Sequence, residues 1–203
     1  MSLSILFVRA AFLIAALLFI LGIKRMASPL KARSGIQWAG VGMLLATAAS
    51  FFYQDENGEG LHNLPWIITA LAVSVTAAWI SGKKVAMTDM PQMVALYNGM
   101  GGGSAAAIGL VELLKFSAGP QGVSKAALIF AVIGSLIGSI SLTGSLIAWA
   151  KLDGRMDRRF VFPGQQYFNL LVFLTAVVLG VLSILWLQQP IIIAFFIAAL
   201  AVG

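Results

Sequence analysis

Residues 88–109 read TDMPQMVALYNGMGGGSAAAIG, and this stretch decides the fold class. Its five glycines could belong to a loop that holds a phosphate or to a membrane helix with one polar residue inside it. A dinucleotide-binding G-x-G-x-x-G sequence follows a strand, opens a helix and is followed by an acidic residue about 20 positions later. Here Ser104 stands where the third glycine is required after Gly99 and Gly101, and no strand pattern precedes the run. The phosphate-loop interpretation is therefore excluded.

The composition of the whole chain favours the membrane helix. Of its 203 residues, 60% are hydrophobic and only 10% are charged, with a mean hydropathy of +0.97, whereas soluble domains carry about 25% charged residues. A soluble protein of this size needs a polar shell, so the sequence predicts an all-α integral membrane protein. The absence of cysteine excludes disulfides and thiolate metal sites. We attribute the net charge of +6 to basic loops on one side of the membrane rather than to nucleic-acid binding.

Seven apolar segments are predicted as membrane helices, because a spanning helix needs roughly 20 mostly apolar residues. They are residues 3–23, 36–52, 64–81, 91–114, 126–150, 167–187 and 190–203. The first lacks the basic start and the cleavage site of a signal peptide, so we expect it to be retained. The last covers only about 21 Å of a hydrocarbon core of about 30 Å. We expect a polytopic helix bundle of six full transmembrane helices plus the start of a seventh, as a fragment of a longer protein.

The loops between these segments alternate in charge. Ten of the thirteen Lys and Arg residues follow the first, third and fifth segments, whereas the loop after the second carries Asp55, Glu56 and Glu59. Basic loops face the cytoplasm in membrane proteins, which places the N-terminus outside. His62, the only histidine, falls in the acidic external loop and is interpreted as solvated rather than as a ligand or proton relay.

The segment 91–114 has the features of a helix with a polar face. Thr88 or Asp89 can cap it, Pro91 fits the first turn, and Gln92 completes a capping box with Asp89. One face of the helix is small or polar throughout. Its members are Asn98, Gly102, Ala105, Gly109 and Glu112.

The segment 126–150 carries a hydroxyl stripe in which a Ser or Thr recurs every four residues, at Ser135, Ser139 and Thr143. Small residues let a neighbouring helix approach closely in lipid. The glycines predicted to pack helices in this way are Gly99, Gly101, Gly102, Gly103, Gly109, Gly134 and Gly138. Packing alone remains an alternative for the serines, because Ser and Thr can satisfy their own helix carbonyls.

Four stretches together resemble one known family. Residues 87–109, MTDMPQMVALYNGMGGGSAAAIG, resemble the fourth membrane helix of the β subunit of proton-translocating NAD(P) transhydrogenase. Residues 23–43, IKRMASPLKARSGIQWAGVGM, resemble its first cytoplasmic loop and second helix. Residues 138–156, GSISLTGSLIAWAKLDGRM, and the later FPGQQYFN resemble its fifth helix, the following loop and its sixth helix.

The resemblance implies a part in a Re/Si-specific enzyme that couples proton movement to hydride transfer between NAD(H) and NADP(H). NAD(H) is then bound by an α subunit. NADP(H) is bound by a C-terminal domain of the β subunit, which follows nine membrane helices and is expected to be absent from this chain. This fragment by itself would hold no catalytic residue, cofactor or metal. The implied partners are the membrane helices of the α subunit and the bilayer, in a dimer of heteromers in the bacterial cytoplasmic membrane.

One position departs from the family pattern. Many members carry a proton-relay histidine where this chain has Asn98, whose amide does not titrate. In relatives with the YNGMGGG pattern, the histidine is expected from an α-subunit helix, and imidazole with a pKa of about 6.5 suits proton relay. We expect Asn98 to face that histidine in a water-containing passage between the 91–114 and 126–150 helices, with Asp89 coupling proton release to the nucleotide domain. The predicted proton-pathway residues are Asn98, Ser139, Ser135, Thr143, Tyr97, Glu112 and Asp89.

Two other functions are compatible with the residues alone. One is half of a secondary transporter with a polar midplane site on the 91–114 and 126–150 helices. The other is a scaffold subunit with no polar pathway.

Overall fold

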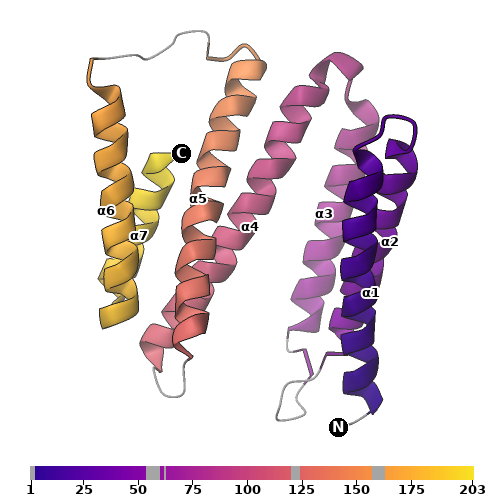
Figure 1. Cartoon of the computed structure of the whole chain (residues 1–203), viewed down its shortest axis with the longest axis horizontal. Helices are drawn as coiled ribbons and strands as arrows, with labels where there is room; N and C mark the ends of the chain where they lie inside the picture. The colour runs from indigo at the N-terminus through magenta and orange to yellow at the C-terminus, as the bar shows by residue number, and fades with distance from the viewer. Residues whose placement is uncertain (1–2, 54–59, 62, 120–123, 157–162) are drawn as a thin grey trace. The chain divides into compact units, whose positions relative to one another are not determined.

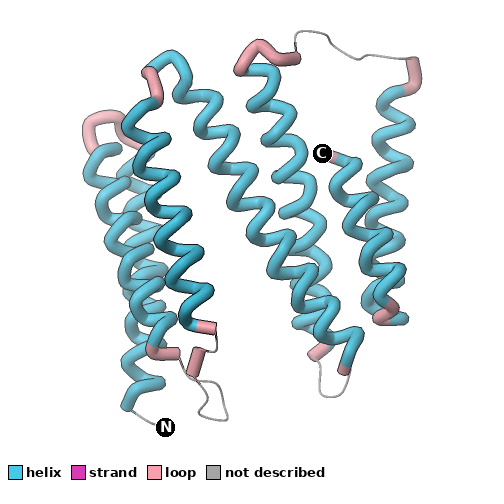
Figure 2. The backbone as a smooth tube through the Cα atoms, turned by 180° about the vertical axis from the view of Figure 1, so that it is seen from behind, coloured by secondary structure: helices cyan, strands magenta, loops and turns pink. Residues whose placement is uncertain are grey.

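The computed structural model describes residues 3–53, 60–61, 63–119, 124–156 and 163–203. All regular structure in these ranges is helical (Figure 2). The helices are α1 (Leu3–Met26), α2 (Ala32–Phe51), α3 (Leu64–Lys84), the short 3-10 helix η1 (Met87–Asp89), α4 (Met90–Ala118), α5 (Lys125–Leu152), α6 (Gln165–Trp186) and α7 (Gln189–Val202). His62, the acidic residues of its loop, and Arg158 and Arg159 lie outside the described residues.

Each predicted segment corresponds to one helix, but most helices are longer than the apolar run. Helix α3 continues through Lys83 and Lys84, and α4 continues past Lys115. Apolar runs mark only the part of a helix that matches the hydrocarbon, whereas a lysine can extend its stem along apolar surface and keep its ammonium group in water. The helix ends therefore lie beyond the limits that hydropathy predicts.

Five helices among the described residues are long and apolar enough to cross a membrane: α1, α3, α4 together with η1, α5 and α6. Helix α2, which was predicted as a full span, is not among them although it has 20 residues. Its Arg33, Ser34 and Gln37 make its first turns polar. Helix α7 is apolar but has only 14 residues.

The chain divides into two compact units, Met1–Ile80 and Ser81–Gly203. In the first unit, α1 and α2 form a hairpin whose backbones meet at glycines. A Cβ atom added to Gly35 would lie 2.6 Å from the carbonyl oxygen of Gly22, and one on Gly42 would lie 3.1 Å from that of Ala15. Helix α3 buries none of its residues.

The second unit is built on the α4–α5 pair, whose two long helices lie side by side (Figure 1). Helix α7 packs against α5 and α6 and also touches α4. Its Ile192, Phe195 and Ala199 are fully buried, and Phe195 packs beside Gly180 of α6. The buried core of this unit is Ala106, Leu113, Leu128, Val132, Ile192, Phe195, Phe196 and Ala199.

Candidate functional site

The polar side chain of Asn98 reaches from α4 to two serines of α5. Its Nδ2 donates hydrogen bonds to Ser145 Oγ at 2.9 Å and to Ser141 Oγ at 3.3 Å. The neighbouring Gly99 brings the helices close enough for this, since a Cβ atom added there would lie 3.0 Å from the Cβ of Ser145. We call Asn98, Ser141 and Ser145 the Asn98 cluster. Each of its hydrogen bonds stabilises the helix pair by about 0.5–1.5 kcal/mol.

The Asn98 cluster leaves one polar group of the amide open. A carboxamide has two N–H donors and a carbonyl oxygen that accepts. Both donors are directed to serine oxygens, so Oδ1 is available as an acceptor, and the Asn98 side chain is exposed in this chain. The amide can therefore accept a hydrogen bond from water or from an N–H group, but it cannot carry a proton through the membrane itself.

Beyond Asn98 the backbones of α4 and α5 touch directly. A Cβ atom on Gly138 would lie 2.6 Å from the carbonyl oxygen of Gly102, and one on Gly109 would overlap the hydroxyl of Ser135. A water molecule needs a cavity of about 10–15 Å³, and contacts this close leave no such space. The predicted water-containing passage thus has no room between these glycines. We call this contact between the two helices the α4–α5 seam. Asn98 is exposed and lies at the edge of the seam, where open space begins.

The other glycines predicted to pack helices fall into two groups. Gly99 and Gly103 face α5, where a Cβ atom on Gly103 would lie 3.2 Å from Leu142 Cδ1. A Cβ atom on Gly101 or Gly134 would meet no described atom within 4 Å. Packing within the described residues therefore explains why Gly99 and Gly103 are glycines, but it does not explain Gly101 and Gly134.

The hydroxyl groups of the predicted stripe on α5 bond mainly within their own helix. Ser135 Oγ donates to the Ala131 carbonyl at 2.6 Å, and Thr143 Oγ1 donates to the Ser139 carbonyl at 3.0 Å. Such bonds to the preceding turn are the usual way in which Ser and Thr are satisfied inside a helix. Ser139 differs, because it is fully buried and its Oγ has no hydrogen-bond partner among the described residues.

The stripe does not form one continuous polar surface. Ser135 faces Gly109 of α4, whereas Thr143 faces Gly203 at the end of α7. Successive residues four apart are rotated by about 40° around an α-helix with 3.6 residues per turn. Ser139 therefore lies between the side of α5 that contacts α4 and the side that contacts α7.

The predicted side-chain cap of α4 is wrong. Thr88 Oγ1 donates to the Asp89 carboxylate at 3.1 Å, and neither side chain caps the helix, which η1 precedes directly. Gln92 Nε2 donates to the Leu152 carbonyl at 3.0 Å instead of completing a capping box. The last carbonyls of a helix have no partner within it, so Gln92 satisfies the end of α5 and ties it to the start of α4. Pro91 does lie in the first turn.

Tyr97 and Asp89 have partners away from the Asn98 cluster. The hydroxyl of Tyr97 lies 3.0 Å from Ser81 Oγ, at the end of α3, and this bond lies within the second unit. The carboxylate of Asp89 accepts from its neighbour Thr88. The structure thus does not join these two predicted pathway residues to Asn98.

Glu112 belongs to a groove between α4 and α5. It accepts from Lys115 Nζ at 3.1 Å, and their side chains are 41% and 66% exposed respectively. Exposed pairs of this kind contribute at most about 1 kcal/mol. The groove has a volume of about 400 Å³, and among the described residues that line it Glu112 is the charged one. Its other lining residues are Ala105, Ile108, Gly109, Phe116, Ala127, Phe130, Ala131 and Gly134.

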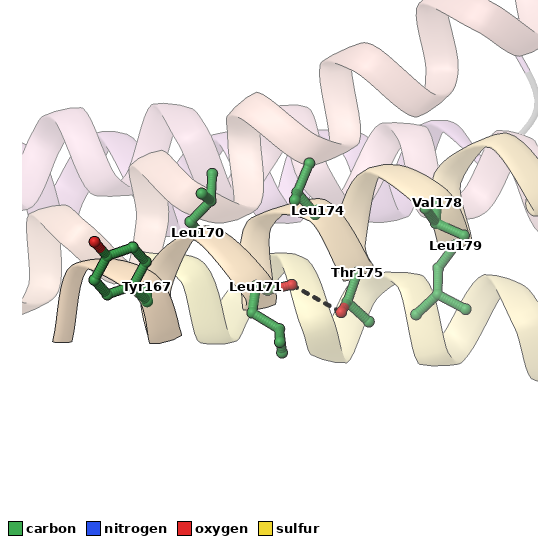
Figure 3. Close-up of a pocket in the computed structure, with 7 residues that line it drawn as sticks. All are labelled: Tyr167, Leu170, Leu171, Leu174, Thr175, Val178 and Leu179. Atoms are coloured by element: carbon green, nitrogen blue, oxygen red, sulfur yellow. Dashed lines mark hydrogen bonds between the residues drawn. The ribbon is translucent and has the colours of Figure 1, made fainter. Parts of the chain in front are cut away.

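A larger groove of about 570 Å³ follows α6 and is almost entirely apolar (Figure 3). It is lined by Tyr167, Leu170, Leu171, Leu174, Thr175, Val178 and Leu179. The hydroxyl of Thr175 donates to the Leu171 carbonyl at 2.8 Å, so it is satisfied within the helix. The side chains that line this groove offer mainly apolar contact, and Tyr167 and Thr175 contribute its hydroxyl groups.

Ser141 and Ser145 were not among the predicted site residues. A signal for them exists in the antiparallel register of the two helices. Gly99 faces Ser145, Gly102 faces Ser141, and Gly109 faces Ser135. The residue numbers therefore rise along α4 as they fall along α5. Pairing the glycines of one segment with the serines of the next in reverse order would have placed both serines beside Asn98.

Comparison with known proteins identifies the family of the chain. Residues 8–203 match the family model described as NAD(P) transhydrogenase beta subunit. The chain is similar to the NAD(P) transhydrogenase subunit beta of Rhodospirillum rubrum, with 31% identity over 162 residues. The subunit of the same name from a designated strain of that species matches equally well. Each alignment covers 77% of this chain and 34% of the relative, so the chain spans about a third of the length of the curated relatives it matches.

Proposed function

The chain belongs to the NAD(P) transhydrogenase beta subunit family, and from this premise we propose that its helices form part of the path by which protons cross the membrane. In this proposal proton movement is coupled to Re/Si-specific hydride transfer between NAD(H) and NADP(H). NADP(H) binds in a part of the beta subunit outside these 203 residues, and NAD(H) binds to an alpha subunit. The membrane helices themselves hold the proton path and no nucleotide.

The observation that carries the proposal is the Asn98 cluster. An amide inside an apolar helix needs a hydrogen-bond partner, and here Ser141 and Ser145 accept from its nitrogen. Its Oδ1 then accepts from a donor outside the α4–α5 seam. We assign this donor to water and to the imidazole of an alpha-subunit histidine, which takes up and releases protons near neutral pH. Water beside Asn98 lies on the exposed edge of the seam, because the glycine contacts close its interior.

The proposed setting is a bacterial cytoplasmic membrane, with the alpha subunit bound and the heteromer dimerised. Helix α2 crosses the bilayer together with α1, to which it packs along paired glycines that include Gly22 and Gly35. The basic residues after α1, α3 and α5 face the cytoplasm, and the N-terminus lies outside.

Replacing Asn98 with Leu in the whole enzyme tests this function. The loss of two hydrogen bonds of about 0.5–1.5 kcal/mol each, if felt in the proton-transfer step, lowers proton-coupled turnover roughly tenfold for each 1.4 kcal/mol. We expect this loss in proteoliposomes that carry a pH gradient, with assembly unchanged. Asn169→Leu is the matched control, because Asn169 is an exposed amide near the start of α6.

The two variants separate the possible roles of Asn98. Equal coupled turnover in Asn98→Leu and the unmodified enzyme would remove Asn98 from the proton path. Equal loss in Asn98→Leu and Asn169→Leu would show that any apolar replacement of a membrane amide disturbs the enzyme, and the proposal would then lose its support.

A further inference from the structure

Two arginines at helix ends stack on tryptophans, and they differ in their counterions. The guanidinium of Arg25 lies 4.6 Å from the ring centre of Trp38, and its Nε donates to Ser34 Oγ at 3.1 Å. The guanidinium of Arg155 lies 4.9 Å from the ring centre of Trp149. Its Nε is paired with the carboxylate of Asp153. The second pair thus carries its own anion, whereas the first is held by neutral groups.

The stretch of chain that holds Arg25, the two helices α1 and α2 and the turn between them, contains no acidic residue. Residues 1–54 contain no Asp or Glu. Lys24, Lys31 and Arg33 surround the same turn between α1 and α2, and all three side chains are exposed. Four positive charges within ten residues repel one another unless an anion from outside the hairpin lies between them.

The geometry of Arg25 leaves its two Nη groups able to bind a phosphate. Stacking on Trp38 fixes the plane of the guanidinium, and the bond to Ser34 uses Nε. The two Nη groups make no hydrogen bond to the described residues, and they form the planar fork that binds two oxygens of one phosphate. The fork is therefore already oriented before a ligand arrives.

Its surroundings indicate where the phosphate comes from. Tryptophan in membrane proteins marks the depth of the lipid headgroups, and Trp38 is partly exposed beside Arg25. At the tip of the turn Leu30 is 96% exposed. An exposed leucine among basic side chains suits a lipid surface, which offers acyl chains and phosphates together.

We propose that Arg25, held by Trp38 and Ser34 and supported by Lys24 and Lys31, binds the phosphate of an anionic phospholipid at the α1–α2 turn. This site lies in the first compact unit, whereas the Asn98 cluster lies in the second.

The test uses the whole protein in its natural complex, placed in nanodiscs of phosphatidylcholine mixed with phosphatidylglycerol. After delipidation, the phosphatidylglycerol that stays bound is measured by native mass spectrometry. A basic residue near an anionic surface contributes about 1 kcal/mol, so Arg25→Gln should lower retention about fivefold. Arg155→Gln is the matched control and should leave retention unchanged. Ser34→Ala keeps every charge and should also lower retention, because it frees the fork to rotate.

Several outcomes would overturn the proposal. One is unchanged retention in both Arg25→Gln and Ser34→Ala. Another is an equal fall in Arg155→Gln, which would show a general charge effect. A third is loss of another subunit from Arg25→Gln in discs of phosphatidylcholine alone, which would make the occupant an acidic protein surface. A fourth is stabilisation of the complex against thermal unfolding by inorganic phosphate to the same extent as by phosphatidylglycerol, which would show that a free anion suffices.

Discussion

Adjacent glycines on α4 provide a direct measurement of the contact between α4 and α5. Gly102 lies against α5, where an added Cβ atom would be 2.7 Å from Ser141 Cβ and 2.8 Å from the Gly138 carbonyl oxygen. The same atom on Gly101 would meet nothing within 4 Å. Gly101→Ala and Gly102→Ala therefore add one methyl group at neighbouring positions of the same helix, one in open space and the other against a backbone.

The difference between the two variants isolates the cost of the contact. Both replacements gain about 1 kcal/mol of helix propensity, and this gain cancels in the comparison. At Gly102 the helices must separate by about 0.6 Å to restore ordinary contact, and a gap of about 0.5–1 Å forfeits a quarter to a half of the dispersion energy of each contact. Inserting a methyl group into a packed interior costs about 1–3 kcal/mol. We expect Gly102→Ala to be less stable than Gly101→Ala by that amount.

Thermal unfolding of the purified chain in detergent, followed by circular dichroism, measures this difference. Separation of the helices would also stretch the bond from Asn98 to Ser145 from 2.9 Å toward about 3.5 Å, where a hydrogen bond is lost. Equal stability of the two variants would show that α4 and α5 do not touch at Gly102. The account of the seam given above would then be refuted.

Two further substitutions test single polar groups. Ser139→Ala should stabilise the chain by about 1–3 kcal/mol in the same unfolding assay, because it removes a fully buried hydroxyl that has no partner among the described residues; a destabilised variant would mean that the hydroxyl is hydrogen-bonded to a buried water. Tyr97→Phe and Ser81→Ala should be non-additive by about 0.5–1.5 kcal/mol, since the two hydroxyls are 3.0 Å apart. A double-mutant cycle on unfolding free energies measures this coupling, and additive effects would exclude the bond.

The helices could be predicted from the sequence because long apolar runs separated by charged loops have few other interpretations. Their ends could not, since Lys83 and Lys84 belong to α3 although they end the apolar run. The span predicted over residues 36–52 rested on its apolar run and left out the first four residues of α2. Its polar first turns keep it out of the set of strongly apolar helices.

The site could be predicted only in part, because two faces of α4 have similar sequences. Asn98, Gly102, Ala105 and Gly109 of the predicted face contact α5, whereas the buried residues of α4 are Gly99, Ala106, Gly109 and Leu113, which share only Gly109 with that face. A shift of one residue rotates a helix face by about 100°. Small residues recur at the same spacing on both faces, so their spacing could not choose between them. The choice follows from Leu113, which enters the core shared with α7.

The direct backbone contact between α4 and α5 also limits how this part of the protein can move. Sliding α5 by one turn in one direction would carry the side chain of Leu142 to the place that Gly138 now leaves for Gly102, and in either direction Ser145 would leave Asn98. The close glycine contacts therefore favour a single register of α4 against α5. If the proposed proton path requires motion here, we expect the two helices to move together as one rigid body, with the change occurring where their outer surface meets other helices.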